Sequence, residues 1–501
     1  MEVKVKHGRI EKEATDALVL THFEGETHLQ PEAERVDKAL GGWLRESLKS
    51  GEFSGASNQS ALVHTRGKIP AKRVLLLGLG KRKDVKLDSL RQAMATATKR
   101  VRQAGGKAWA TSSQGHAVPR TSATDIAQAM VEGAMLGGYQ FKVYRSNDHD
   151  PPAPKLMTLV EEHAGALAEV REGIRRGRVT AEATSFVRDL CNHPANVMTP
   201  SRVAAEARKL GRKAGVKVQV LERKAIERLG MGALLGVARG SHEPPKFIIL
   251  EHKGAGRNSK PTVLVGKTIT FDSGGISLKP SENMEQMKAD MTGGAEVLAT
   301  VCAAARLKLP LHVIGILPAT ENMPGGRAIK PGDIVTTLSG KTVEIQNTDA
   351  EGRLILADGL AYATRYKPAA IIDIATLTGA CVVALGQFAI GMLGNDDKVK
   401  ARLVRSGQKT GERVWEMPLW DEYFEQLNSD VADMRNIGGR GGGMITAALF
   451  LSKFVGVYPW VHLDIASTDW SERERAYLPK GPTGIGTRLL IQYLIDEAER
   501  A

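Results

Sequence analysis

Cysteine and aromatic residues are scarce in this chain of 501 residues. The three cysteines, Cys191, Cys302 and Cys381, are widely spaced and odd in number, which excludes a disulfide framework and a thiolate metal knuckle. They fit a reducing cytosol, and we expect three buried, unreactive thiols. Aromatic residues make up only 5% of the chain, so its hydrophobic cores must rest on Leu, Val, Ile and Ala.

The sequence also has no long, uninterrupted apolar run. Charged residues from Glu2 to Glu13 interrupt the segment in which a signal peptide would be apolar, so we expect no export and a cytoplasmic location. The most apolar stretch, residues 371–394, contains Asp373, Gln387 and several glycines, which argues against a membrane-spanning helix. This stretch is expected to form a buried strand followed by a loop.

The composition is that of a globular protein with more than one domain: 42% of the residues are apolar and 25% are charged. The net charge of +13 and the pI near 9.5 raise nucleic acid as a second partner. Runs of basic residues are usually solvated surfaces, and these have no interleaved aromatics, so nucleic acid is not the favoured partner. The basic clusters lie within Lys81–Lys83, Arg171–Arg178 and Arg208–Lys213.

Apolar segments and helical patterns alternate along most of the chain, which predicts an α/β protein. The first part contains strands at 17–20 and 73–78, a helix at 87–104, and a proline-rich loop at 146–154. A long connecting helix ends near residue 191. Beyond residue 200 we expect helices at 202–214 and 293–307 and strands at 217–221, 246–250, 262–265 and 312–317. This alternation favours a largely parallel sheet with helices on both faces. The predicted domains are 1–160 and 192–501, joined by 161–191.

Four acidic residues and two lysines occur in two clusters that follow predicted strands. The first cluster contains Lys267, Asp272, Lys279 and Asp290, with paired glycines that allow the backbone to approach a ligand. In the second cluster, Asp349 and Glu351 follow a predicted strand at 342–345, and continued strand geometry would point both to the same side. The sequence therefore predicts four neighbouring carboxylates.

Crowded carboxylates raise one another's pKa unless cations neutralise them, so two divalent ions are expected at this site. Oxygen ligands suit Mg²⁺ or Mn²⁺, whereas an amine ligand brings Zn²⁺ into range. Lys267 can bind a metal only as the neutral amine. A single-zinc protease with an HExxH helix is disfavoured, because the one His-Glu pair, His242-Glu243, continues as Pro-Pro-Lys. A two-metal phosphoesterase would use the same ligand types.

At these clusters the sequence resembles the leucyl aminopeptidase family, the cytosol aminopeptidases, which are two-metal metallopeptidases. The segment Asn347–Arg353 reads NTDAEGR, similar to the family's signature. Further similar runs are NHPAN at 192–196, ENMP at 321–324, WVHLDIA at 460–466 and GPTG at 481–484. Together they extend the resemblance strongly from about residue 186 to residue 490.

The resemblance implies a metal-dependent release of N-terminal amino acids from peptides by a two-metal-activated water. Asp272 and Glu351 would bridge the ions, Lys267 and Asp290 would complete one site, and Asp349 the other. The resemblance assigns catalytic roles to Lys279, as the cation that stabilises the oxyanion, and to Arg353, as the holder of a bicarbonate general base.

The resemblance further implies an apolar pocket for the first side chain of the substrate, and hence a preference for Leu or Met. It also implies a smaller, macro-like N-terminal α/β domain, a larger catalytic α/β domain with a central mixed sheet of eight strands flanked by helices, and a homohexamer. A DNA-binding, architectural role through the basic surface is the alternative function. The residues matched to the substrate pocket are Met287, Thr376, Thr378 and Gly379.

Overall fold

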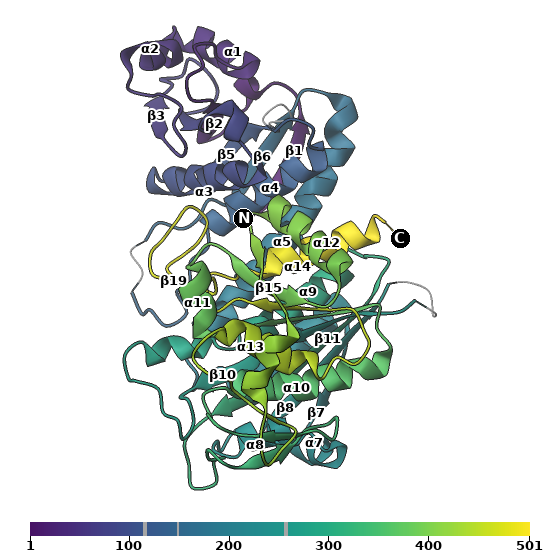
Figure 1. Cartoon of the computed structure of the whole chain (residues 1–501). Coiled ribbons are helices and arrows are strands. Elements are labelled where there is room, and N and C mark those ends of the chain that lie inside the picture. Colours follow the sequence, from purple (N-terminus) through teal and green to yellow (C-terminus); the bar gives the residue numbers. More distant parts are fainter. Residues whose placement is uncertain (114–117, 148–149, 255–258, 501) are drawn as a thin grey trace. The chain divides into compact units, whose positions relative to one another are not determined.

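The structure is a computed structural model, and it describes residues 1–113, 118–147, 150–254 and 259–500. The chain divides into two compact units (Figure 1). The smaller unit contains residues 1–182 and 473–479, and the larger unit contains residues 183–472 and 480–501. Helix α5 (Leu167–Asn192) contributes residues to both units. The predicted boundaries at residues 160 and 191 lie on either side of this division.

The smaller unit is built on a six-stranded sheet in the order β1-β6-β5-β2-β4-β3. The strands pair in parallel except β3, which is antiparallel to β4 at the edge. The strands are β1 (Glu2–His7), β2 (Ala17–His22), β3 (Ser60–His64), β4 (Arg73–Gly78), β5 (Ala108–Ser112) and β6 (Leu156–Glu161).

Helices cover both faces of this sheet. Alternate residues of its central strands therefore pack into two different hydrophobic cores. Leu18 and Leu20 pack in one core with residues of α1 (Pro31–Leu40) and α2 (Trp43–Ser50). Val19 packs in the other core with residues of α3 (Leu87–Gln103) and α4 (Ala123–Gly137). Successive side chains of a strand point to opposite faces of the sheet, so both faces are buried here, as expected for parallel strands.

The larger unit contains a mixed sheet with the path β16-β15-β18-β14-β9-β11-β8-β7, and a ninth strand, β10, pairs with β11. The sheet is parallel from β18 through β11 and antiparallel at β8 and β7, so the expectation of a largely parallel sheet holds only for its centre. The strands are β7 (Lys217–Leu221), β8 (Lys246–Lys253), β9 (Thr262–Gly266), β10 (Thr268–Asp272), β11 (His312–Asn322), β14 (Ala370–Ala375), β15 (Ile390–Gly394), β16 (Val414–Glu416) and β18 (Trp460–Asp464).

Two helix layers enclose this sheet, and β9 shows which helix lies on which face. A Cβ atom on Gly266 would lie 2.4 Å from the carbonyl oxygen of Gly293, so this position faces α9 (Thr292–Arg306). The preceding residue, Val265, faces Gly359 of α10 (Glu351–Ala363) on the opposite side. Helices α6 (Pro200–Ala214) and α14 (Thr487–Ala498) pack against α9, and α8 (Gly232–Ala238) and α13 (Gly443–Ser452) pack against α10.

The larger unit also contains smaller elements outside the central sheet and its main helices. They comprise a three-stranded sheet and two short paired strands, together with α7 and α12. Their bounds are β12 (Ile334–Thr336), β13 (Thr342–Glu344), β17 (Met434–Arg435), β19 (Trp470–Ser471), β20 (Gly481–Pro482), α7 (Arg223–Leu229) and α12 (Asp397–Thr410).

Residues 371–394 differ from the prediction of a strand followed by a loop. After β14, the chain forms a short helix, α11 (Gly379–Leu385), and then a second buried strand, β15. The Thr378 side chain caps α11 by accepting a hydrogen bond from the backbone N–H of Cys381 (3.0 Å). The glycines thus mark the two ends of a helix. No helix within the described residues is long and apolar enough to cross a membrane.

The three cysteines are buried and free, which confirms the expectation of core thiols. Burial raises the pKa of each thiol to about 12. Since the thiolate is the reactive form, we expect a disulfide reagent at pH 8 to label none of the three thiols of the native protein within minutes. Titration in concentrated guanidinium chloride should find all three. Rapid labelling of the folded chain would contradict this burial.

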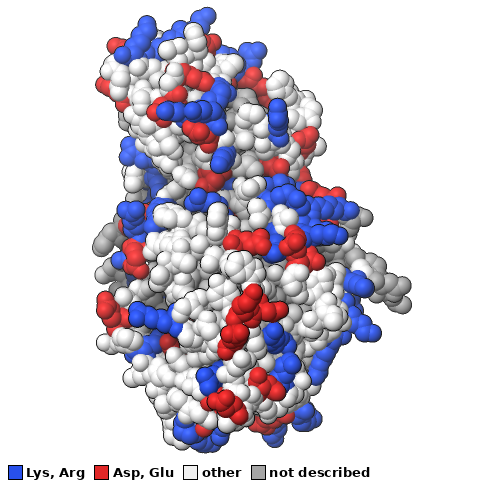
Figure 2. Space-filling view, viewed as in Figure 1, with Lys and Arg blue, Asp and Glu red and all other residues white. Residues whose placement is uncertain are grey.

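Basic side chains do not form one continuous patch on the face shown in Figure 2, where lysine and arginine are interspersed with acidic residues. Of the predicted basic clusters, the first lies at the 3-10 helix Arg82–Asp84, the second on α5 and the third on α6. Several members are neutralised locally. Arg82 pairs with Glu26 (2.5 Å), and Arg175 and Arg176 both pair with Glu172.

Candidate metal centre

Three of the predicted site residues lie at the carboxyl ends of parallel strands in the central sheet of the larger unit. Lys267 follows β9, Asp272 ends β10, and Thr376 follows β14. Strand β11, which pairs with both β9 and β10, ends at Asn322. Ligands of open α/β sheets bind at this edge, where strand ends and the following loops bring distant residues together.

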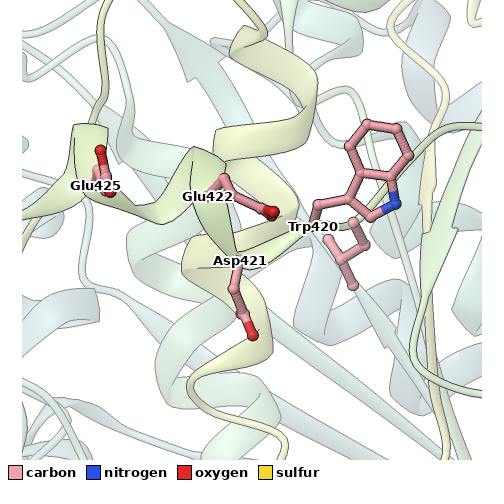
Figure 3. A pocket seen from close by; sticks show the side chains of 5 residues that line it. Trp420, Asp421, Glu422 and Glu425 are labelled. Atoms are coloured by element: carbon pink, nitrogen blue, oxygen red, sulfur yellow. The ribbon is translucent and has the colours of Figure 1, made fainter.

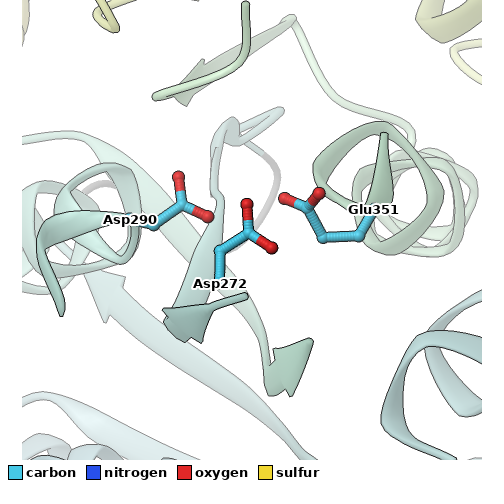
Figure 4. A group of neighbouring side chains, drawn as sticks. All are labelled: Asp272, Asp290 and Glu351. Carbon is cyan, nitrogen blue, oxygen red and sulfur yellow. The ribbon is translucent and has the colours of Figure 1, made fainter. Parts of the chain in front are cut away.

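Three carboxylates converge at this edge. Asp272, Asp290 and Glu351 are buried, and each has an oxygen within 4.8 Å of the others (Figure 4). Asp290 directly follows the 3-10 helix Met284–Ala289, two residues before α9 begins, while Glu351 is the first residue of α10. Figure 4 shows the three side chains pointing toward one another from separate elements. They form the only such group among the described residues.

Lys267 lies within this carboxylate cluster. Its Nζ atom is 2.8 Å from Asp290 Oδ1 and 2.8 Å from Glu351 Oε1, and it donates a hydrogen bond to the carbonyl oxygen of Thr376 (2.8 Å). A Cβ atom on Gly352 would lie 2.6 Å from the Lys267 side chain, so only glycine leaves room for the lysine here. This explains why glycine follows Glu351 in the NTDAEGR segment.

Lys279 joins Asp349 to the cluster. Its Nζ atom is 2.9 Å from Asp272 Oδ2 and 2.5 Å from Asp349 Oδ1. The expectation that Asp349 and Glu351 share one side of a strand is wrong, because β13 ends at Glu344 and Glu351 begins a helix. The two carboxylates reach the same region because a turn separates them, with the Asn347 side chain accepting from the backbone N–H of Asp349 (2.8 Å).

Burial and mutual repulsion raise the pKa values of these acids. Burial raises the pKa of Asp290 well above its ordinary value, and the charges of Glu351 and Asp272 raise it further. Burial and Asp272 also raise the pKa values of Asp349 and Glu351. Burial would lower the pKa of Lys267, but the surrounding carboxylates raise it above its ordinary value. The protein alone therefore leaves this negative charge incompletely balanced.

Two features of the site indicate that it can bind divalent cations. Four carboxylates against two lysines leave a formal charge of −2. The buried Oδ2 atom of Asp290 has no hydrogen-bond partner in the part of the chain that the structure describes, although buried carboxylate oxygens normally have one. If a bound dication displaces the proton of Lys267, its neutral amine and the carboxylate oxygens are a ligand set for Mn²⁺ or Zn²⁺.

Two asparagines that our sequence reasoning did not single out hold the predicted site residues. Asn322 donates to Asp272 Oδ1 (2.8 Å) and to the carbonyl oxygen of Thr348 (3.0 Å). The Asn436 carbonyl oxygen accepts from Arg353 Nη1 (2.9 Å), and its side chain bonds both the N–H of Gln346 (2.8 Å) and the C=O of Asn347 (2.7 Å). Both asparagines are buried, so they fix the loops on which the ligands lie.

Arg353 is buried on α10, two residues after Glu351. Burial lowers the pKa of its guanidinium to about 10. Its Nε atom is buried and has no hydrogen-bond partner among the described residues. A guanidinium with a free donor direction can receive an additional planar anion.

The predicted substrate-pocket residues come from two segments beside the carboxylates. Met287, in the 3-10 helix Met284–Ala289, is partly exposed three residues before Asp290. Thr376 donates through its hydroxyl to Asp290 Oδ1 (2.7 Å). Thr378 is buried at the start of α11, whereas Gly379 is exposed. Both segments therefore connect directly to the acidic cluster.

A second hollow lies around the 3-10 helix Asp421–Leu427 and has a volume of about 910 Å³. Figure 3 shows that the carboxylates of Asp421, Glu422 and Glu425 point in different directions beside Trp420. They form no convergent ligand group among the described residues, unlike the cluster in Figure 4. This hollow contains none of the predicted site residues, and we assign no metal to it.

Comparison with known proteins gives the same result for both units. The model of the cytosol aminopeptidase family, catalytic domain, matches residues 185–491, and that of the N-terminal domain of the same family matches residues 19–148. A probable cytosol aminopeptidase of Geotalea uraniireducens is 51% identical over 92% of each chain.

Two solved structures are similar over nearly the whole chain. A tomato leucine aminopeptidase mutant is 32% identical, with a TM-score of 0.87 over 99% of this chain and 96% of that one. The bottromycin maturation enzyme BotP in complex with Mn is 35% identical, with a TM-score of 0.85 over 97% and 100%. Family models that cover both units and a fold shared with these enzymes agree with the acidic centre described above. This chain therefore belongs to the cytosol aminopeptidase family and is a metallo-aminopeptidase, a hydrolase of peptides.

Proposed function

We propose that this aminopeptidase holds two divalent ions, Mn²⁺ or Zn²⁺, and releases apolar N-terminal residues such as Leu and Met. The ligands would be the buried carboxylate cluster, with the unpartnered Asp290 Oδ2 as the observation that carries the assignment. The similar enzyme BotP, whose structure is a complex with Mn, supports Mn²⁺. The proposed ligands are Lys267, Asp272, Asp290, Asp349 and Glu351.

Two such ions, when bound, lower the pKa of a water molecule and polarise the carbonyl group of the scissile peptide bond. The chain supplies the fixed positions of the ligands. Asn322 holds Asp272 and Asn436 holds the loop before Asp349, so the carboxylates keep their positions without ordering on binding.

Lys279 is proposed to stabilise the negative charge that develops on the carbonyl oxygen. Its side chain is 23% exposed, whereas that of Lys267 is 4% exposed, so Lys279 can reach a substrate from the rim of the cluster. The neighbouring carboxylates raise its pKa above the ordinary value, which keeps it cationic. A fixed cation at a developing oxyanion is among the largest contributions to such a reaction.

Arg353 is proposed to hold a bicarbonate ion beside the carboxylate cluster. Its free Nε direction and its anchored Nη1 atom fit a planar anion, and burial strengthens the interaction. Bicarbonate, when bound, would serve as the general base of the reaction.

The pocket for the first side chain is proposed to lie between Met287 and the turn that contains Thr376, Thr378 and Gly379. A thioether and small residues at its wall suit an unbranched or γ-branched apolar side chain. The attachment of both segments to Asp290 supports this placement, because the N-terminal residue of the substrate must lie at the metal centre.

We also propose a cytoplasmic location and a homohexamer. The names of the relatives as cytosol aminopeptidases and the three free, buried thiols support the first. The hexamer rests on the family resemblance. Nucleic acid is not the favoured partner, because several residues of the basic clusters, Arg82, Arg175 and Arg176, pair with acidic residues.

The test is hydrolysis of leucine p-nitroanilide by protein stripped with a chelator and then supplied with Mn²⁺, Zn²⁺ or Co²⁺. We expect metal to raise the activity of the wild type by at least about 100-fold and that of Asp349→Ala far less, because the variant lacks one ligand. Metal content measured beside activity should reach two ions per chain only in the wild type. Full activity in the stripped protein would contradict the proposal.

A further inference from the structure

The turn between β14 and α11 is fastened by one buried carboxylate, Asp464, which ends β18. Asp464 Oδ1 accepts hydrogen bonds from the backbone N–H groups of Leu377 (3.1 Å) and Ala466 (3.2 Å), with Thr378 N at 3.4 Å. Its other oxygen, Oδ2, accepts from the Thr378 hydroxyl (2.7 Å). The side chain of Asp464 is fully buried, so little water competes for its two carboxylate oxygens.

The same turn is tied to the metal ligands on its other side. The carbonyl oxygen of Thr376 accepts from Lys267 Nζ (2.8 Å), and its hydroxyl donates to Asp290 Oδ1 (2.7 Å). Thr378 in turn caps α11 through the N–H of Cys381. Asp464 thus fixes Leu377 and Thr378, which lie between Thr376 at the ligand cluster and the exposed Gly379.

We propose that Asp464 is a positioning residue that determines which N-terminal side chain this enzyme accepts. This inference rests on the proposed function, in which the turn forms one wall of the pocket for that side chain. With Asp464 in place, the wall holds one shape. Without it, the N–H groups of Leu377 and Thr378 lose their acceptor and the wall relaxes away from the pocket.

The sheet supplies the rigid base for this arrangement. Asp464 pairs in register with Ala375, the last residue of β14, and the backbone N–H of Ile465 donates to the carbonyl oxygen of Ala375 (2.8 Å). The carboxylate therefore starts from a parallel strand directly beside the turn that it holds. A site built on strand ends positions groups more precisely than a free loop does.

Asp373 provides a matched control. It lies on β14, two residues before Ala375, the residue that pairs with Asp464. Asp373 is also fully buried and accepts from Trp460 Nε1 (2.6 Å) and bonds His462 Nδ1 (2.6 Å). None of its hydrogen bonds among the described residues reaches the turn, so Asp373→Asn disturbs a buried carboxylate without releasing the pocket wall.

The test is the ratio of kcat/KM for leucine p-nitroanilide to kcat/KM for alanine p-nitroanilide at saturating Mn²⁺. We expect this ratio to fall at least 10-fold in Asp464→Ala, through a higher KM for the leucine substrate. Asp464→Asn, which keeps one acceptor, should lie within 3-fold of the wild type. Thr378→Val keeps the shape and removes the hydroxyl, and it should lower the ratio about 5-fold, whereas Thr378→Ser should not. Asp373→Asn should lower the melting temperature and leave the ratio within 2-fold.

Met287→Ala separates this inference from the proposed pocket. If Met287→Ala changes the ratio but Asp464→Ala and Thr378→Val do not, Asp464 has only a structural role and the inference is overturned alone. If none of the three changes the ratio, the proposed pocket fails as well. A loss of activity without a change of ratio in Thr378→Val likewise overturns the inference, and this variant keeps the test valid should Asp464→Ala not fold.

Discussion

Replacing Glu351 with glutamine is expected to lower kcat/KM for leucine p-nitroanilide by more than about 1,000-fold, or about 4 kcal/mol of transition-state stabilisation. The glutamine keeps the size of the side chain but removes a charge from the centre of the buried cluster. Lys267 would keep its contact with Asp290, so the fold should survive. Stopped assays at high enzyme concentration, with the metal content of the same sample, measure the effect.

Glu296→Gln is the matched control for this change. Glu296 is fully buried on α9 in the same unit, and within the described ranges neither of its carboxylate oxygens has a hydrogen-bond partner. Burial raises its pKa well above the ordinary value, so an uncharged amide replaces a group that burial already favours as neutral. Its activity should remain within about 3-fold of the wild type. An equal loss in both variants would show that any buried glutamate matters, and Glu351 would lose its special role.

Lys279→Met is expected to lower kcat by about 100-fold to 1,000-fold, the range found when one oxyanion donor is removed. KM should change little, because the interaction strengthens only as charge develops on the carbonyl oxygen. The methionine keeps the length of the side chain but cannot donate. Both Asp272 and Asp349 stay in place as ligands, so two ions per chain should still bind.

Lys246→Met tests whether the loss is specific to that position. Lys246 is a buried lysine of β8 paired with Glu222, and it belongs to the same unit. Its replacement should reduce stability without a large change in kcat. If Lys279→Met instead raised KM in proportion to its loss of kcat/KM, Lys279 would bind the substrate rather than its transition state.

Regular elements could be predicted well wherever their sequence pattern was unbroken. The strand expected at 217–221 coincides with β7, and the helix expected at 87–104 ends one residue earlier as α3. Half-buried strands and amphipathic helices show their period directly in the sequence. The prediction for residues 371–394 was wrong because α11 has only seven residues, which is too short to show a helical period in the sequence.

The composition of the metal cluster was predictable, but its geometry was not. Asp272, Asp290 and Glu351 come together as expected, since strand ends and adjacent loops meet at one edge of a parallel sheet. Asp349 and Glu351 were expected to project from one strand, and instead a turn and a helix start place them. Spacing in a sequence does not show where a strand ends when the next residues are polar.

Asn322, Asn436 and Asp464 had no recognisable signal of their own. Asparagine and aspartate are the commonest residues of turns, so single examples predict only a turn. Their roles depend on contacts with residues far away in sequence, such as the bond from Asn322 to Asp272 and the one from Arg353 to Asn436. The only sequence signal for Asn322 and Asp464 is that they lie inside the family-like runs ENMP and WVHLDIA.

The segment 473–479 belongs to the smaller unit although it lies near the end of the chain. Its Tyr477 is buried against Ala95, Leu136 and Ala181, and its hydroxyl donates to Asp88 (2.6 Å). During synthesis on the ribosome, the first 182 residues emerge long before this segment exists. The surface of Ala95, Leu136 and Ala181 that Tyr477 covers therefore stays exposed to solvent until almost the whole polypeptide has been translated. In a fragment that ends at residue 182, this apolar surface would stay exposed permanently.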